Sequence, residues 1–299
     1  MRLILILLLL AAPAWADAPR VVTDIPPVQS LVARVMQGVA TPDMVVTGGS
    51  AHHASLRPSQ ARLLQQADLV VWIGPELTPW LGKAVTSYAP AHELRLLQHS
   101  GPHLLPMRDL LDADDDDHDH GHDHDHAEGG IDPHAWLDPE IAQFWLGQIA
   151  AVLSRVDPEH ATLYADNAAQ GRAEIAATTA RAAQMLAPVR GVAYVSAHDA
   201  FQYFEQRFGL SPAGAVTLGD AARPSPARIA ELRDLMGAGE ITCAFSEPQS
   251  NDRLLRTAAG GQTLTIVELD PLGQRMVPGP ELYSRLIEAL VRDMAGCLG

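Results

Sequence analysis

A tract near the middle of the chain consists almost entirely of side chains that bind metals. From Asp114 to His126, thirteen residues include seven aspartates and five histidines. Imidazole and carboxylate groups are ligands for transition metals, and so polar a tract cannot build a packed core. We expect residues 109–129 to be a disordered loop that collects metal weakly, with a solvated charge run as the alternative. The auxiliary weak sites would be His118, His120, His122, His124 and His126.

Four further positions carry metal-ligating side chains in segments that we expect to be ordered. His52 or His53 precedes an expected helix, and His134 stands in Asp132-Pro-His-Ala-Trp-Leu-Asp-Pro139. His198 lies where a strand gives way to a helix, and Asp270 ends a strand. Taken singly, each has a structural explanation, such as a hydrogen-bonded histidine or a turn-initiating aspartate. Together they indicate one site, because strand ends in doubly wound sheets face the ligand crevice.

The residue types at this site favour zinc. Three neutral imidazoles and one carboxylate suit four-coordinate Zn²⁺, whereas manganese prefers more oxygen ligands. Glu247 follows another expected strand and is either a spare ligand, an outer partner of the site or a turn-capping carboxylate.

Short β-branched runs alternate with helical patterns, which predicts an α/β fold with parallel sheets. An internal echo, Arg57-Pro-Ser-Gln-Ala-Arg-Leu63 and Arg223-Pro-Ser-Pro-Ala-Arg-Ile229, suggests two lobes of like architecture, unless it is a chance resemblance. In both copies, serine is expected to cap a helix and proline to begin it. The expected strands cover 21–24, 68–73, 192–196, 241–245 and 264–269.

A helix that begins at Asp157-Pro158 and continues to Leu186 would join the lobes as a rigid strut. An ordinary amphipathic helix of one lobe is the alternative. The expected division is residues 1–16 as a signal peptide, 17–156 as the N-terminal lobe, 157–187 as the linking helix and 188–299 as the C-terminal lobe.

The N-terminus resembles an export signal. Arg2 precedes an apolar run that is too short to span a bilayer, and Ala14-Trp-Ala16 fits cleavage after Ala16. We therefore expect an exported, periplasmic protein without direct membrane insertion. The net charge is −15, and ten acids without a Lys or Arg lie in 109–128, so the acidity is local. Because no basic patch offsets phosphate repulsion, nucleic acid is not an expected partner.

The chain contains only two cysteines, Cys243 and Cys297. Export and an even count favour one disulfide, with two buried free thiols as the alternative.

The whole mature chain resembles the zinc-binding proteins of bacterial ABC importers, the ZnuA type of the cluster A-I metal solute-binding family. The motifs that carry the resemblance are His52 with Ser55-Leu-Arg-Pro-Ser59, the Asp/His-rich tract, Asp132-Pro-His-Ala-Trp-Leu-Asp-Pro139, His198-Asp-Ala-Phe-Gln-Tyr-Phe204, Phe245-Ser-Glu-Pro-Gln249 and Leu269-Asp-Pro-Leu-Gly273.

This resemblance implies two Rossmann-like lobes joined by a long helix, with metal bound in the cleft between them. It implies His52, His134, His198 and Asp270 as ligands and a pairing of Cys243 with Cys297. Manganese-type relatives place an acidic residue at the position of His198, which again favours zinc. Ala51 departs from relatives that have an acid beside the first histidine, and His53 could substitute for His52.

The resemblance predicts a monomeric receptor, not an enzyme, that captures Zn²⁺ and delivers it to the membrane permease of an ABC importer. Three alternatives remain: a manganese or iron receptor of the same fold, a zinc-dependent hydrolase, and a zinc buffer that binds through the loop alone. The hydrolase is disfavoured because the chain lacks HExxH and GxSxG motifs and because a fourth protein ligand would close the site.

Overall fold

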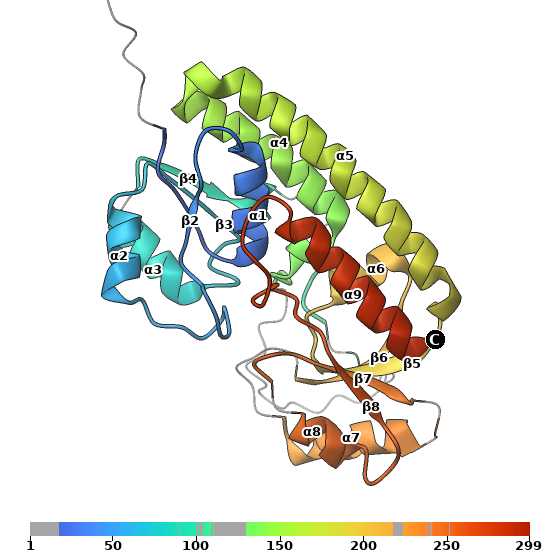
Figure 1. Ribbon diagram of the computed structural model, residues 1–299. Helices are drawn as coiled ribbons and strands as arrows, with labels where there is room; N and C mark the ends of the chain where they lie inside the picture. Colours follow the sequence, from blue (N-terminus) through green and yellow to red (C-terminus); the bar gives the residue numbers. More distant parts are fainter. Residues whose placement is uncertain are drawn as a thin grey trace, which may run out of the picture.

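The computed structural model describes residues 18–88, 90–99, 101, 104–108, 110, 130–217, 224–237, 239, 241–250 and 252–299. The expected signal peptide and the histidines of the Asp/His-rich tract lie outside the described residues. The described part contains two parallel four-stranded sheets flanked by helices, which confirms the predicted fold class (Figure 1).

The N-terminal sheet has the strand order β2-β1-β3-β4. Helix α1 covers one face of this sheet, and α2 and α3 cover the other (Figure 1). Every residue of α1 is buried, so this helix lies inside the main core. The elements are β1 (Val21–Thr23), α1 (Pro26–Val35), β2 (Asp43–Met44), α2 (Pro58–Gln65), β3 (Leu69–Trp72), α3 (Pro79–Tyr88), β4 (His92–Arg95) and the 3-10 turn η1 (Leu96–His99).

The C-terminal sheet repeats this order as β6-β5-β7-β8. Helices α7 and α8 pack on its outer face, and its inner face joins the main core. The two sheets therefore share one topology, as the internal echo predicts. The elements are β5 (Ala193–His198), α6 (Gln202–Phe208), β6 (Ser211–Thr217), α7 (Pro226–Gly237), β7 (Cys243–Ser246), α8 (Arg253–Ala258), β8 (Thr265–Glu268) and α9 (Leu282–Leu298).

The two copies of the echo start their helices differently. Helix α2 begins at the first proline, Pro58, and the Arg57 N–H donates to the Gln60 side chain at 2.7 Å. Helix α7 begins two residues later in the motif, at Pro226, where the Ser225 hydroxyl accepts the Arg228 N–H at 3.1 Å. Serine therefore caps only the second helix, because a second proline there moves the helix start.

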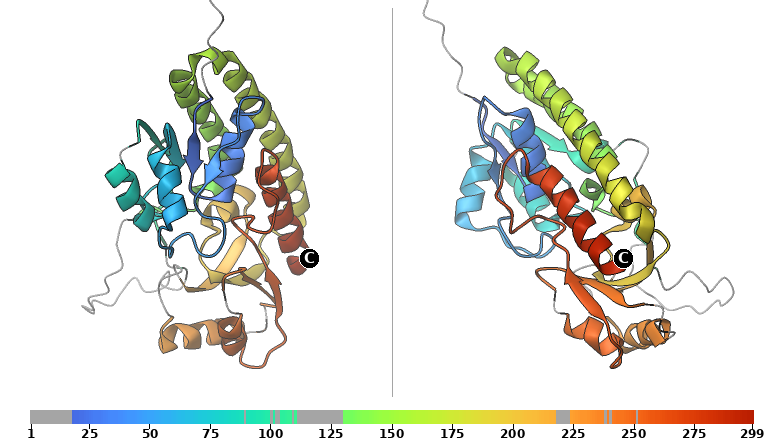
Figure 2. Two further views of the ribbon diagram at one scale, coloured as in Figure 1. Left: turned by 60° about the vertical axis from the view of Figure 1, so that its left-hand side comes forward. Right: turned by 45° about the vertical axis from the view of Figure 1, so that its right-hand side comes forward.

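A long helix connects the lobes and lies along both of them (Figures 1 and 2). The predicted helix over 157–186 is α5 (Ala161–Leu186), with 3-10 turns η4 (Pro158–His160) and η5 (Ala187–Val189) at its ends. It packs along α4 (Pro139–Val156) and α9. Gly171 continues the helix, and a Cβ there would lie 3.0 Å from Arg34 and Leu146, so glycine permits close packing.

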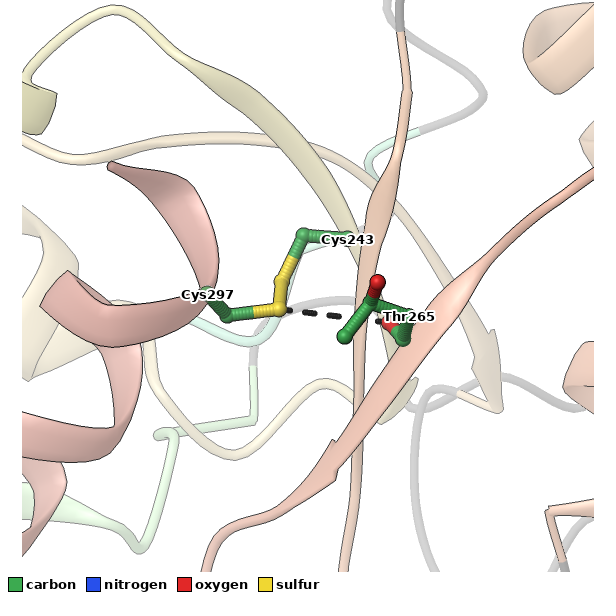
Figure 3. Close-up of a disulfide and its surroundings, with 3 residues drawn as sticks. All are labelled: Cys243, Thr265 and Cys297. Carbon is green, nitrogen blue, oxygen red and sulfur yellow. Dashed lines mark hydrogen bonds between the residues drawn. A yellow bond between two sulfur atoms is a disulfide. The ribbon is translucent and has the colours of Figure 1, made fainter.

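The disulfide expected from the sequence is present and belongs to the C-terminal lobe. Cys243 begins β7, and Cys297 lies in the last turn of α9, 54 residues later. Figure 3 shows the bridge beside β8, where the Cys297 Sγ atom is 3.9 Å from the Thr265 carbonyl oxygen. The bridge fastens the C-terminal helix to the centre of the second sheet.

Among the described residues, no helix combines the length and the apolar character that crossing a membrane requires.

Candidate metal centre

Three histidines from distant parts of the chain converge between the lobes. The ligand atoms of His52, His134 and His198 all lie within 4.8 Å of one another. The Nε2 atoms of His52 and His134 are 3.4 Å apart. The ring centroid of His198 is 5.1 Å from that of His134 and 6.0 Å from that of His52. The three imidazoles are therefore close enough together to share one metal ion.

His134 lies immediately before the 3-10 turn η3 (Ala135–Leu137), which leads into α4. The Asp132 carboxylate accepts the His134 backbone N–H at 2.9 Å and contacts its ring Nδ1 at 2.7 Å. A carboxylate partner makes Nδ1 the protonated nitrogen and leaves the Nε2 lone pair for a metal. Both side chains are buried, so the ring orientation is well defined.

His198 is the last residue of β5 and has an equivalent arrangement with Glu247. The Glu247 Oε1 atom lies 3.1 Å from His198 Nδ1, and its Oε2 atom accepts a hydrogen bond from the Gln249 amide. The Glu247 backbone N–H donates to the Ser250 hydroxyl at 2.8 Å. The carboxylate is therefore used to orient His198 and to anchor the turn that follows β7.

His52 lies in the loop between β2 and α2 and is half-buried. Its backbone N–H donates to the Ser50 hydroxyl at 3.2 Å, and the preceding Ala51 carbonyl accepts a hydrogen bond from Trp80 Nε1 at 2.8 Å. The neighbouring His53 is exposed and does not belong to the three-histidine group. Tertiary structure thus separates two adjacent histidines that the sequence leaves equivalent.

Asp270 does not belong to the three-histidine group. Its carboxylate accepts backbone N–H groups of Leu272 and Arg275, each at 3.2 Å. The residues that follow, Pro271 and Leu272, line the pocket, and Trp136 Nε1 donates to the Pro271 carbonyl at 2.8 Å. Asp270 as a fourth ligand stays a prediction.

The pocket around the cluster has mostly apolar walls and a volume of about 10 Å³, close to the space that one water-sized particle needs. An apolar surround strengthens charge interactions inside the site and limits access of water. The wall side chains include Ala51, Leu77, Trp136, Ala200 and Leu272.

The contact of Asp132 with His134 was not predicted, although both residues belong to the same motif. A carboxylate two residues before a candidate histidine predicts such a contact, because a short backbone turn brings the carboxylate to the histidine Nδ1. The wall residue Leu77 has no such pattern, since its place depends on how the strands and helices pack.

Comparison with known proteins gives a consistent result. The family described as "ZnuA: Zinc-uptake complex component A periplasmic" matches residues 21–297. A high-affinity zinc uptake system protein ZnuA from Paracoccus denitrificans is 43% identical over 311 residues, covering 97% of this chain and 94% of that protein. The protein of the same name from Brucella abortus is 37% identical over 304 residues, covering 93% and 91%.

Solved structures agree on the fold. A crystal structure of ZnuA superposes with a TM-score of 0.77 at 22% identity and covers 95% of this chain and 100% of its own. The periplasmic zinc-binding protein TroA from Treponema pallidum has a TM-score of 0.78 at 16% identity, covering 94% and 99%.

Proposed function

Because the chain belongs to the ZnuA family of periplasmic zinc-uptake components, we propose that it captures Zn²⁺ outside the cytoplasmic membrane and delivers it to the permease of an ABC importer. The observation that carries this proposal is the convergence of His52, His134 and His198 in one pocket between two lobes. Zinc is the cargo of this receptor, so the site must bind it tightly and still release it.

The proposed ligands are the Nε2 atoms of the three histidines. Asp132 and Glu247 serve as partners that fix the orientation of His134 and His198. Asp270 or a water molecule completes a four-coordinate shell. Movement of the Asp270 side chain away from its two backbone N–H partners would be needed for the first of these options.

Ligand chemistry favours zinc over the manganese or iron alternative. Three imidazoles and at most one carboxylate match Zn²⁺, whereas Mn²⁺ prefers sites rich in oxygen. Competition between the metals for the same protein decides this point. Bound zinc should resist a tenfold excess of Mn²⁺ or Fe²⁺.

The family comprises solute-binding receptors, and we propose no catalytic activity for this chain. A catalytic zinc needs an open coordination position and a nearby general base. Glu247, the carboxylate nearest His198, is engaged with that ring and with Gln249, so it is a poor general base. Esterase or peptidase turnover by zinc-loaded protein that disappears in His134→Ala would support the hydrolase alternative.

We propose export through a signal peptide that is cleaved after Ala16 and a monomeric mature protein. Mass spectrometry of periplasmic protein should find Asp17 at the N-terminus. We also propose that the histidines of 109–129 form auxiliary sites weaker than the pocket, because ordering a polar segment around metal costs conformational entropy.

The main test is a chelator-competition zinc titration of metal-free mature protein, alongside a variant that lacks residues 109–129. One tight site should survive the deletion, and only weaker binding should vanish. His52→Ala should then strongly weaken zinc binding in the deletion variant, whereas the matched His53→Ala should retain tight binding. Loss of tight binding with the deletion would instead identify a zinc buffer and refute the proposed ligand set.

A further inference from the structure

The three histidines of the candidate site are held unequally. His134 and His198 are 4% and 5% exposed, and each has a buried carboxylate on its Nδ1 atom. His52 is half-buried and lies between Met44, the end of β2, and Pro58, the start of α2, where the chain has no helix or strand. The position of His52 therefore depends on what holds this loop.

Gln60 of α2 binds the start of this loop, where its Nε2 donates to the Val45 carbonyl at 2.7 Å. Two other side chains bind the loop backbone nearer to His52. Trp80 belongs to the same lobe, and its Nε1 donates to the Ala51 carbonyl at 2.8 Å. Gln274 belongs to the C-terminal lobe and makes two hydrogen bonds with one residue, Gly49. Its Oε1 accepts the Gly49 N–H at 3.0 Å, and its Nε2 donates to the Gly49 carbonyl at 2.7 Å.

Several features make the Gln274 contact specific. A primary amide that pairs with both polar groups of one residue fixes the position and the direction of that backbone. Gly49 has a φ of 80°, a conformation that favours glycine. The residue at this position therefore favours the backbone conformation that Gln274 binds. Gly49 is three residues from His52, and Gln274 is four residues from Asp270. The contact therefore joins the loop of His52 in the N-terminal lobe to the segment after β8 in the C-terminal lobe.

We propose that Gln274 is a positioning residue that ties the loop of His52 across the cleft and thereby lengthens the residence time of zinc. This inference rests on the proposed function. Zinc leaves most easily through its least anchored ligand, and release of the loop removes His52 from the shell while His134 and His198 stay in place. Two exposed hydrogen bonds between neutral groups have a modest net strength, so the contact between Gln274 and Gly49 can break.

The experiment measures zinc dissociation from the full mature chain after mixing with excess EDTA. Gln274→Ala should accelerate dissociation about tenfold, equal to about 1.4 kcal/mol. The matched control is Gln143→Ala, which removes a glutamine of similar exposure whose amide donates to the Pro139 carbonyl of its own helix. That control should leave the dissociation rate unchanged.

A double-mutant cycle tests the route through His52. In a His52→Ala background, Gln274→Ala should change zinc affinity less than twofold, because the ligand it positions is absent. Hydrogen exchange of a peptide that contains Gly49 should be faster in the single variant Gln274→Ala than in the wild type. An unchanged dissociation rate, or an equal effect of Gln274→Ala with and without His52, would overturn the proposal.

These results separate the two proposals. Wild-type protein without a tight zinc site would refute the proposed function itself. Tight wild-type binding that weakens in His52→Ala but not in Gln274→Ala would refute only the positioning role of Gln274.

Discussion

The carboxyl edges of the two sheets have the same strand order but carry different chemistry. In the N-terminal sheet, Asp24 follows β1, and its buried carboxylate accepts the N–H groups of Ile25 at 2.9 Å and Ile73 at 2.8 Å. In the C-terminal sheet, β5 occupies the matching place and ends in His198, which Glu247 reaches from the neighbouring β7.

This difference shows how one architecture serves two purposes. At the first edge the Asp24 carboxylate binds backbone N–H groups of its own lobe and does not orient a histidine. At the second edge a carboxylate orients an imidazole toward the cleft. The N-terminal lobe therefore supplies its histidines from other places, His52 from a loop and His134 from the entry to α4. Individual side chains, and not the fold alone, therefore determine where the site lies.

The largest expected effect is on zinc binding at the C-terminal edge. His198→Ala should weaken zinc binding about 100- to 1,000-fold, because a four-ligand zinc site is worth about 10–16 kcal/mol and one ligand contributes about a quarter of that. A chelator-competition titration measures this loss. His92→Ala, an exposed histidine on β4 of the N-terminal sheet, is the control and should bind zinc like the wild type.

The disulfide is a second difference, because only the C-terminal sheet is fastened by one. Cys243→Ser with Cys297→Ser should lower the free energy of unfolding by about 4 kcal/mol, as expected for a closed loop of this length. Urea unfolding with and without reductant measures it, and reductant should affect only the wild type. Zinc affinity should change little, since Cys243 lies at the opposite end of β7 from Glu247. A variant as stable as the wild type would contradict this role.

Glu247→Gln tests whether the carboxylate beside His198 contributes to zinc affinity, because it removes the negative charge while keeping the shape of the side chain. Outer partners of a ligating histidine typically contribute 10–100-fold to metal affinity, so a loss of about 30-fold is expected. Glu268→Gln changes another carboxylate at a strand end of the same sheet, one that is exposed and paired with Arg275. If both variants lose affinity equally, the effect is one of general charge and not of orientation.

The last expected effect concerns the N-terminal edge and the pH dependence of its stability. Burial raises the pKa of Asp24 from 3.8 to about 7, although the N–H groups of Ile73 and Ile25 oppose the shift. The folded state then binds more protons than the unfolded state between about pH 4 and pH 7. Stability from this group is therefore lost as the pH rises through that window, by at most about 1.4 kcal/mol per pH unit.

Asp24→Asn should remove this contribution, so its urea-unfolding free energy should vary less between pH 4 and pH 7 than that of the wild type. The variant should also be less stable overall, because an amide N–H would face a backbone N–H. Asp43→Asn, an exposed aspartate on β2, should keep the wild-type slope. An unchanged slope in Asp24→Asn would show that Asp24 does not titrate in this range.

Strands were predicted where the sequence offers an apolar, β-branched run, which includes the edge strand β8. Every predicted strand exists, and the strands that were missed, β2, β4 and β6, all lie at sheet edges. Edge strands need no continuous apolar run. Strand β4 reads His-Glu-Leu-Arg, and β6 contains proline and glycine, which are tolerated where one side of a strand is unpaired.

The sequence by itself determined the fold class, the long linking helix, the metal-binding character of the chain and the residue types of the site. These properties depend on periodicity and composition, which act over short stretches of chain. Only the tertiary structure decided that His52 and not His53 joins the cluster, that Glu247 contacts His198, and that Gln274 reaches Gly49. Those contacts join residues 49 to 225 positions apart, and their formation depends on how the two lobes pack around a shared core.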